Sequence, residues 1–502
     1  MKVWNPIKEF AGARACFHCV LCVAAGGALP AQTYTTLYSF DYSTGAAWPD
    51  GGLVQASDGL LYGTTYDGEY GSQVSDGGTI FKMTTGGALT TIEKFCTANR
   101  ECRAFYGPMA PLIEATDGHL YGTTFGDPTS TGEGLSPGGV YEITGAGLKP
   151  LYNFCTQTGC PDGLKPSGPL IQAFNGDLYG TTEFGGSGTI GFSAYCTPEY
   201  VGAGCGTVFK VTLTGEFTKL YTFCLAGGTC ADGASPNGGL VEAPNGDLYG
   251  TTIGGGNNDA GTVFKITPGG TLTTLYAFCA QSGCPDGMNP SALVLSPGGD
   301  LYGTTYLGGT GGLGTVFKIT PSGTFTTVHS FCAEGGNCPD GANPVTALFV
   351  ASDGNLCGST AAGGPTGQGT IFEITPGGKL STLYGAGVTT VMQHTNGDFY
   401  GTTSAGGTSG FGTVFSLSAG LPAFVETIPA AGRLGAAVRI LGTDLMGATS
   451  VTFNGAAAVF DVVSSTEITT TVPAGASSGK VQVAMPGVVA TLSTNVSFGV
   501  LP

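Results

Sequence analysis

Seven returns of one short phrase constrain this chain more than any other feature. The copies read GLLYGTT, GHLYGTT, GDLYGTT three times, GNLCGST and GDFYGTT. Their shared glycines are Gly63, Gly122, Gly180, Gly250, Gly303, Gly358 and Gly401, at spacings of 59, 58, 70, 53, 55 and 43 residues. Strand-type repeats of about 40–50 residues are typical of β-propellers, in which each repeat forms one four-stranded blade. Loops of unequal length explain the uneven spacing, so we predict an all-β, seven-bladed propeller.

One repeat shows the four strands clearly. In GLVEAPNGDLYGTTIGGGNNDAGTVFKITPGGTLTTLYAF, we expect strands at 239–243, 247–252, 261–267 and 272–278. PNG and PGG supply the glycines that tight hairpins need. The Leu and Tyr of the phrase are expected in the sheet interface, its Gly where backbones approach closely, and its Asp in the turn, bonding local backbone. A calcium site needs several converging oxygen ligands, which one Asp per blade does not supply.

The two ends of the repeat array predict how the ring closes. The seventh copy has three strands and then runs into different sequence, whereas residues 33–40, TYTTLYSF, look like a fourth strand without the preceding three. Placing this N-terminal strand in the seventh blade removes two exposed sheet edges. We therefore expect a propeller over residues 32–420.

The repeated phrase no longer occurs after residue 421, and the sequence pattern changes. Short alternating runs follow one another there: VRI, SVTFNG, AVFDVV, EITTTVP and KVQVAM. Such runs indicate a small immunoglobulin-like β-sandwich over residues 421–502.

The first 31 residues have the order of a secretory signal peptide. Lys2, Lys8 and Arg14 precede the apolar run ACFHCVLCVAAGGALPA, and cleavage is expected after Ala31. The alternative is a soluble N-terminal helix. No later segment reaches the ~20 apolar residues of a membrane helix, and Cys22 lacks the small preceding residues of a lipoprotein signal. We expect a secreted or cell-surface protein that does not insert into the membrane once the signal is removed.

Thirteen cysteines remain after the signal, and twelve of them form close pairs in the sequence. The pairs are Cys96/Cys102, Cys155/Cys160, Cys196/Cys205, Cys224/Cys230, Cys279/Cys284 and Cys332/Cys338. Zinc needs four ligands at regular spacing, whereas each pair belongs to its own repeat and has no His nearby. Disulfides of an oxidising compartment are the favoured interpretation, with Cys357 left unpaired and buried.

Two family resemblances follow from these motifs. The pattern GDLYGTT…GTVFKITPxGxxTxLYxF resembles the GloVer repeat of bacterial exported, choice-of-anchor tandem-repeat proteins, over residues 33–418. The segment from Phe424 to about Phe498, through GTDLMGATSVTFNG and STEITTTVPAGASSGKVQV, resembles an IPT/TIG domain. The first resemblance implies an extracellular propeller-like array and brings no catalytic residues. The second implies a spacer or presentation module, and the ending VSFGVLP lacks the hydrophobic anchoring tail that such proteins often carry.

The net charge and the sequence motifs limit the classes of function that this chain can have. A net charge of −17 and a pI near 4.4 exclude the basic patch that nucleic acid requires. His18 lies in the signal, and His119, His329 and His394 lie in different blades, where strand or turn roles are expected. The acids Asp50, Asp162, Asp232, Asp286 and Asp340 follow the pattern PDG or ADG and are expected as one turn cap per blade. No nucleophile triad or phosphate loop is present, and we expect a monomer without cofactor or metal.

Two function classes remain. The first is a non-catalytic recognition or scaffold protein that binds an extracellular glycan or protein. The second is a secreted carbohydrate-active enzyme, a lyase or glycosidase, which would need two carboxyls roughly 5–10 Å apart on one face.

The working surface is expected on the face that carries the blade crossovers and the loops between second and third strands. Those loops are long in the first three blades. They and the crossovers bring aromatic side chains to one side of the ring: Trp48, Tyr66, Tyr70, Phe105, Phe125, Phe184, Phe192, Tyr195 and Tyr200. Exposed aromatics there would stack on sugars or anchor a protein interface. Alternatively, they pack beneath their own loops.

Overall fold

The computed structural model describes most of the chain from residue 32 onward. The described residues are 32–41, 46–66, 77–95, 107–126, 137–157, 159–186, 196, 204–225, 229–256, 258–487 and 491–501. Residues 1–31 form a separate unit from residues 32–502. Within the described residues, no helix is long and apolar enough to cross a membrane.

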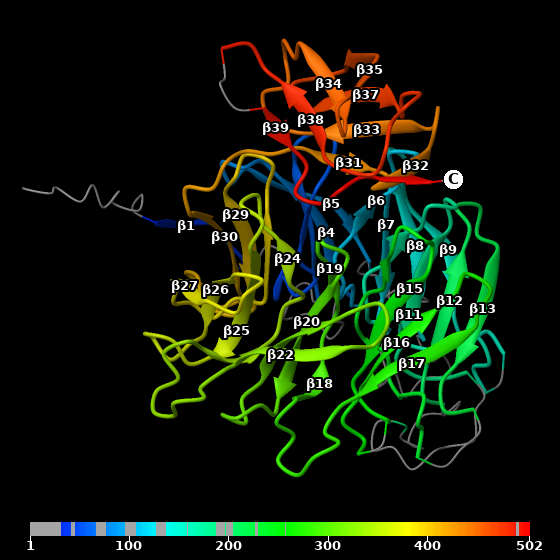
Figure 1. Cartoon of the computed structure of the whole chain (residues 1–502), viewed down its shortest axis with the longest axis vertical. Helices are drawn as coiled ribbons and strands as arrows, with labels where there is room; N and C mark the ends of the chain where they lie inside the picture. The colour runs from blue at the N-terminus through cyan, green and yellow to red at the C-terminus, as the bar shows by residue number, and fades with distance from the viewer. Residues whose placement is uncertain are drawn as a thin grey trace, which may run out of the picture. The chain divides into compact units, whose positions relative to one another are not determined.

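Seven antiparallel sheets of similar build make up the repeat region (Figure 1). The first sheet contains β2 (Leu53–Gln55), β3 (Leu61–Thr65), β4 (Thr79–Met83) and β5 (Leu89–Lys94), and the second contains β6 (Ile113–Glu114), β7 (Leu120–Thr124), β8 (Gly139–Thr144) and β9 (Gly147–Asn153). The third sheet contains β10 (Ile171–Gln172), β11 (Leu178–Thr182), β12 (Thr207–Val211) and β13 (Phe217–Thr222). The fourth contains β14 (Val241–Glu242), β15 (Leu248–Thr252), β16 (Thr262–Ile266) and β17 (Leu272–Ala277). The fifth sheet contains β18 (Met288–Pro290), β19 (Val294–Leu295), β20 (Leu301–Leu307), β21 (Thr315–Ile319) and β22 (Phe325–Ser330). The sixth contains β23 (Ala342–Pro344), β24 (Phe349–Val350), β25 (Leu356–Ala362), β26 (Thr370–Ile374) and β27 (Leu380–Tyr384). The seventh contains β28 (Thr390–Gln393), β29 (Phe399–Thr403), β30 (Thr413–Ser418) and β1 (Thr33–Ser39). We number these sheets blades one to seven.

The N-terminal strand completes the seventh blade, as the sequence predicts. β1 pairs antiparallel with β30, from Thr33 opposite Ser418 to Ser39 opposite Thr413, and the blue β1 lies beside β30 in Figure 1. The Tyr34 ring stacks on Tyr384 of the sixth blade at 4.4 Å. The strand therefore joins neighbouring blades as well as filling its own sheet.

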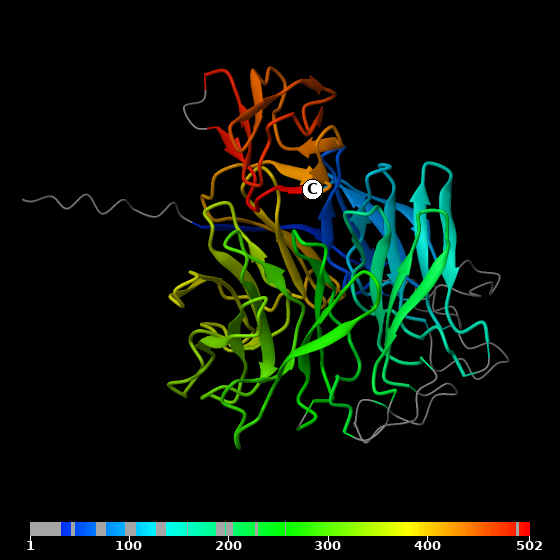
Figure 2. The ribbon, with the colours of Figure 1, turned by 45° about the vertical axis from the view of Figure 1, so that its right-hand side comes forward.

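Buried side chains connect each blade to the next. Figure 2 shows cyan and green sheets of neighbouring blades next to one another. One core joins Phe81 of blade one to Val414 of blade seven, through Phe40, which is fully buried. Six further cores join the remaining pairs of neighbours. Among the described residues, the blades thus form a closed ring.

The glycine of the repeated phrase makes room for an aromatic ring within its own blade. Gly250 pairs directly with Phe264 on the next strand, and a Cβ on Gly250 would lie 2.5 Å from the Phe264 ring carbon Cζ. The equivalent pairs in other blades repeat this arrangement, with Tyr141 replacing Phe opposite Gly122. The expected close approach therefore occurs between strands of one blade, not between blades.

The Asp of the phrase also does more than bond its turn. Within its turn, the Asp247 N–H donates to Asn245 Oδ1, and the Asp247 carboxylate accepts from the Asn245 side-chain amide, not from the backbone as expected. Its carboxylate lies 3.3 Å from Lys265 Nζ on the neighbouring strand. The same ion pair recurs as Asp177–Lys210 and Asp300–Lys318. The repeated Asp and Lys therefore stabilise the blade together.

The C-terminal region forms a small sandwich with three sheets. Its strands are β31 (Glu426–Ile428), β32 (Ala431–Arg433), β33 (Ala437–Leu441), β34 (Ser450–Phe453), β35 (Ala456–Ala458), β36 (Phe460–Val462), β37 (Glu467–Thr471), β38 (Val481–Ala484), β39 (Leu492–Ser493) and β40 (Gly499–Leu501). The sequence suggests one strand for the run AVFDVV, but the structure divides this run between two strands. β35 pairs with β34, whereas β36 pairs with β37 in another sheet. Asn454 and Gly455, both at positive φ, form the tight turn that pairs β34 with β35 before the chain changes sheet.

A series of hydrogen bonds links blades at the face formed by the turns between first and second strands. Gln or Glu near the end of an innermost strand accepts the backbone N–H of the preceding blade's turn. Thus Phe174 N–H donates to Glu242, Thr116 N–H to Gln172 and Ser57 N–H to Glu114. Glu114 also pairs with Arg439 of the sandwich at 2.7 Å. Among the described residues, Glu242 forms no ion pair, and burial raises its pKa to about 7.

We expect Glu242→Gln to stabilise the protein above pH 7, because Gln keeps the acceptor oxygen and removes a poorly solvated charge. A folded-state pKa above the unfolded value means that ionisation lowers stability as the pH rises from about 4.5 to 7. The free energy of unfolding should rise by about 1–2 kcal/mol at pH 8, and not at pH 4. Urea denaturation at both pH values measures this. Glu114→Gln is the matched control, and it should destabilise because Arg439 loses an ion-pair partner. Equal stability of Glu242→Gln and the parent at pH 8 would contradict the prediction.

Candidate functional site

The crossovers between blades are built on a repeated carboxylate. Asp286 accepts hydrogen bonds from the Tyr276 hydroxyl and from the Cys279 N–H. Asp162 and Asp232 make the same two contacts, and Asp340 bonds His329 in place of Tyr. These four acids cap the crossovers and use their carboxylates internally.

Asp50 does not belong to this set, which corrects the grouping based on the PDG pattern. Asp162 lies eight residues before Leu170 of the innermost strand region, whereas Asp50 lies only three residues before Leu53. The segment Trp48-Pro49-Asp50 therefore corresponds to Lys165-Pro166-Ser167. The backbone agrees, because Trp48 and Lys165 both have positive φ, at 53° and 58°. Pro49 and Pro166 also pack alike, each against a glycine of the preceding blade.

A cavity of about 1140 Å³ opens where the seven crossovers meet, and all seven blades contribute to its lining. The position of Asp50 is represented once in each blade. The seven residues are Asp50, Met109, Ser167, Asn237, Ser291, Val345 and Thr389. They lie just before the innermost strands, while Ile253 and Ser404 directly follow second strands and Tyr306 lies near the end of the second strand β20. The cavity is therefore at the crossover face that the sequence predicts as the working surface.

Asp50 is the only charged residue among the described residues of this lining. Burial raises the pKa of its carboxyl to about 6. No hydrogen bond or ion pair of this carboxylate occurs with the described residues, whereas the four crossover acids are all bonded. The same lining includes accessible apolar side chains: Met109, Tyr306 and Val345 are 39%, 43% and 40% exposed. The cavity therefore combines one unpaired anion with a wall of neutral side chains, some apolar and some Ser, Thr, Asn or Gln.

Hydrogen bonds fix the wall of the cavity. Asn289 Nδ2 donates to the Ile253 carbonyl of the preceding blade, and Asn343 Nδ2 donates to that of Tyr306. Thr251 donates to the Ser291 carbonyl across the same boundary. Because these contacts cross from blade to blade, the lining is held by the ring itself.

The aromatic residues expected at this face are only partly described. Trp48, Tyr66, Phe125 and Phe184 are half-buried, whereas Tyr70, Phe105, Phe192, Tyr195 and Tyr200 lie outside the described residues. The Trp48 ring lies 6.4 Å from that of Phe411. The rings of Phe125 and Phe184 face Lys165 Nζ at 4.5 and 5.3 Å. These three aromatics have partners within the protein.

Lys165 is a residue of this face that no sequence motif singles out. It is 4% exposed and occupies the positive-φ position that is Trp48 in blade one. Burial raises the pKa of the nearby Glu183, and the charge of Lys165 opposes that shift. A Lys in place of the Asn found at positions 289 and 343 is the sequence signal for this exception.

Five disulfides lie among the described residues: Cys155–Cys160, Cys196–Cys205, Cys224–Cys230, Cys279–Cys284 and Cys332–Cys338. Four of them close crossovers. Cys96 and Cys102 lie outside the described residues. Cys357 is free and buried, and burial raises its pKa.

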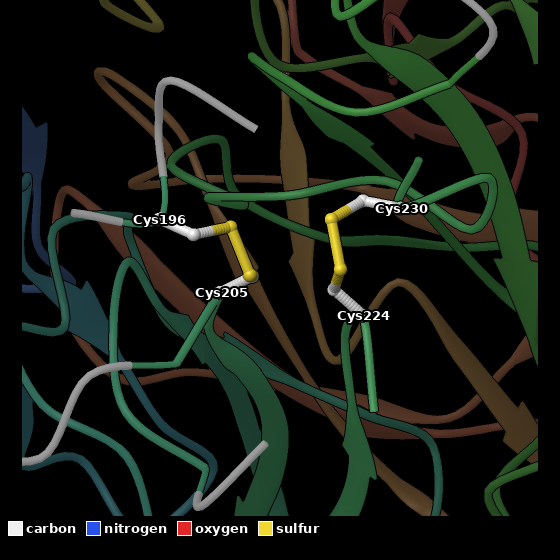
Figure 3. Close-up of side chains that lie close together, drawn as sticks. All are labelled: Cys196, Cys205, Cys224 and Cys230. Carbon is white, nitrogen blue, oxygen red and sulfur yellow. A yellow bond between two sulfur atoms is a disulfide. The ribbon is translucent and has the colours of Figure 1, made fainter. Parts of the chain in front are cut away.

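One pair of disulfides corrects the sequence argument against a four-sulfur cluster. Cys196–Cys205 and Cys224–Cys230 lie side by side, as Figure 3 shows, with all four sulfurs within 4.8 Å of one another. All four residues are at most 2% exposed. Pairs that are separate in the sequence thus meet in the fold. In this structure the sulfurs are bonded to each other, and thiolates are the form that binds zinc.

Comparison with known proteins identifies both regions of the chain. Residues 193–391 match the Gloeobacter/Verrucomicrobia repeat, and residues 422–500 match the IPT/TIG domain. The chain therefore carries these repeats together with a C-terminal IPT/TIG domain, which confirms both resemblances. No curated protein matches it.

Solved structures show only distant likeness. The extracellular domain of a putative hybrid two-component system from B. thetaiotaomicron has 12% identity and a TM-score of 0.46, covering 91% of this chain and 54% of that one. This chain thus spans about half the length of that protein. A putative 6-phosphogluconolactonase from Bacteroides uniformis has 14% identity and a TM-score of 0.41, with coverages of 67% and 84%. An auxiliary nutrient binding protein from Bacteroides thetaiotaomicron has 13% identity and a TM-score of 0.37, with coverages of 77% and 76%. These neighbours establish neither a ligand nor an activity for this chain.

Proposed function

We propose that this chain is an exported, non-catalytic binding protein that holds an extracellular glycan or protein ligand at the crossover face, around the mouth of the central cavity. The observation that carries the proposal is the cavity, because a wall contributed by seven blades gives a concave and rigid site. Ligand sites of proteins are typically concave, mostly apolar and about 300–1,000 Å³ in volume. The disulfides support export, since such bonds persist in oxidising compartments.

The lining does not favour the enzyme alternative. Glycosidases use two carboxyl groups, and the described residues of the cavity supply only Asp50. The crossover acids, such as Asp286, are bonded to Tyr and backbone groups. A binding role requires no second carboxylate.

The proposed site can be tested by filling the cavity. Val345 is 40% exposed in its wall, and Val345→Trp should reduce ligand binding at least tenfold on a glycan array or an array of peptides, because the indole occupies ligand space. Val459→Trp is the matched control, since Val459 is 87% exposed on the sandwich. Melting temperatures of both variants should remain close to that of the parent. Unchanged binding by Val345→Trp would place the site elsewhere, and release of cleaved sugar from a bound glycan would overturn the non-catalytic role.

A further inference from the structure

We propose that the ligand group entering the central cavity is an organic cation: an ammonium or guanidinium attached to an apolar body. This inference rests on the proposed binding function and specifies its chemistry. The first observation is the pseudo-symmetry of the ring: of the seven equivalent cavity positions, one per blade, only one carries a charged residue. Blade one has Asp50, while the other six have Met, Ser, Asn, Ser, Val and Thr.

The contacts of Asp50 distinguish it from a structural acid. Asp162, Asp232, Asp286 and Asp340 each accept hydrogen bonds from a backbone N–H and from a Tyr hydroxyl or His ring, although Oδ1 of Asp286 has no partner among the described residues. Asp50 makes no such bond with the described residues. A partly buried carboxylate without a partner costs free energy, which an incoming cation would return.

The rest of the wall selects the cation's chemistry. The described lining contains no Lys, Arg or His, so no basic residue competes for the carboxylate. Met109 belongs to the neighbouring blade two, and Val345 and Tyr306 add accessible apolar surface. A hard metal ion is a poorer match, because it needs several converging oxygen ligands and the described lining supplies a single carboxylate, Asp50. An ammonium on a hydrocarbon or aromatic body matches both the charge and the walls.

Two sources would supply this chemistry, a free small amine or a lysine side chain of a larger partner. The experiment therefore uses the full mature chain with two charged/neutral probe pairs. Phenethylamine is compared with 2-phenylethanol by calorimetry. An array of random peptides is printed twice, with lysine or norleucine at the central position. We expect at least a tenfold preference for the charged probe in one arm, and the responding arm identifies the source.

Asp50→Asn should abolish this preference, because it removes the negative charge. Asn is chosen because blade four has Asn at the equivalent position 237. Asp461→Asn is the matched control: it removes one exposed acid of the sandwich, outside the cavity, and should retain the preference. The comparison also detects non-specific attraction: the chain has 34 acidic residues, so general binding of cations would survive the loss of one. A preference that survives Asp50→Asn overturns the inference.

Two further outcomes separate the inference from the proposed function. If neutral probes bind as well as charged ones and Val345→Trp removes both, the cavity binds ligands but its chemistry is not cationic. If calcium displaces or replaces the organic cation at Asp50, the inference is also overturned. Absence of binding by all charged probes at millimolar concentration counts against it as well.

Discussion

A chain that lacks residues 32–40 is expected to lose cooperative folding of the ring, or to melt far below the parent. This segment contains β1, which supplies the outer strand of blade seven. Phe40 is fully buried between blades one and seven, and Tyr34 stacks on both Tyr384 and Phe415. Burial of a large apolar side chain stabilises by about 1.5–3 kcal/mol. Tyr34, Leu37 and Tyr38 are half-buried, so that with Phe40 these residues account for about 4–7 kcal/mol, comparable to the stability of many domains.

Deletion of residues 421–502 is the comparison for this truncation. It removes a sandwich with its own buried core of Val, Ile, Leu and Phe, and leaves the seven blades paired. Calorimetric melting of the two truncated proteins distinguishes the roles of the two ends. Equal melting temperatures would show that the N-terminal strand is not needed for closure.

Gly250→Ala is expected to lower the free energy of unfolding by about 1–3 kcal/mol, the usual range for overpacking a core. The added methyl would lie 2.5 Å from Phe264 Cζ and 2.8 Å from Leu240 Cδ2. Since Phe264 is fully buried, neither neighbour has free space to move into. Urea denaturation measures the loss.

A second substitution tests the cause of that loss. Phe264→Leu in the Gly250→Ala background should be less destabilising than Phe264→Leu alone, because the new methyl fills space that the ring vacates. Gly269→Ala serves as the control, since a Cβ there has its nearest neighbour at 3.8 Å and should change stability by less than about 0.5 kcal/mol. Additive effects of the two core substitutions would contradict a steric clash between them.

The repeated phrase determined the architecture because its residues act through local pairing. The alternation in LYGTT and GTVFK, separated by turn residues, predicts strands, and the order of the copies predicts which blades are neighbours. The unpaired run TYTTLYSF predicts closure by the N-terminal strand for the same reason. Once the strands and the exposed sheet edges are known, few ways of pairing the strands into sheets remain.

The site was decided by the tertiary structure. The letters PDG occur at Asp50 and at Asp162, but the distance to the following strand, and hence the direction of the carboxylate, differs. One acid enters the cavity and the other is bonded within a crossover. The meeting of Cys196–Cys205 with Cys224–Cys230 likewise requires two loops to fold onto each other. Sequence alone determined the blades because strand pairing is periodic, whereas the surroundings of Asp50 depend on seven segments that only the closed ring brings together.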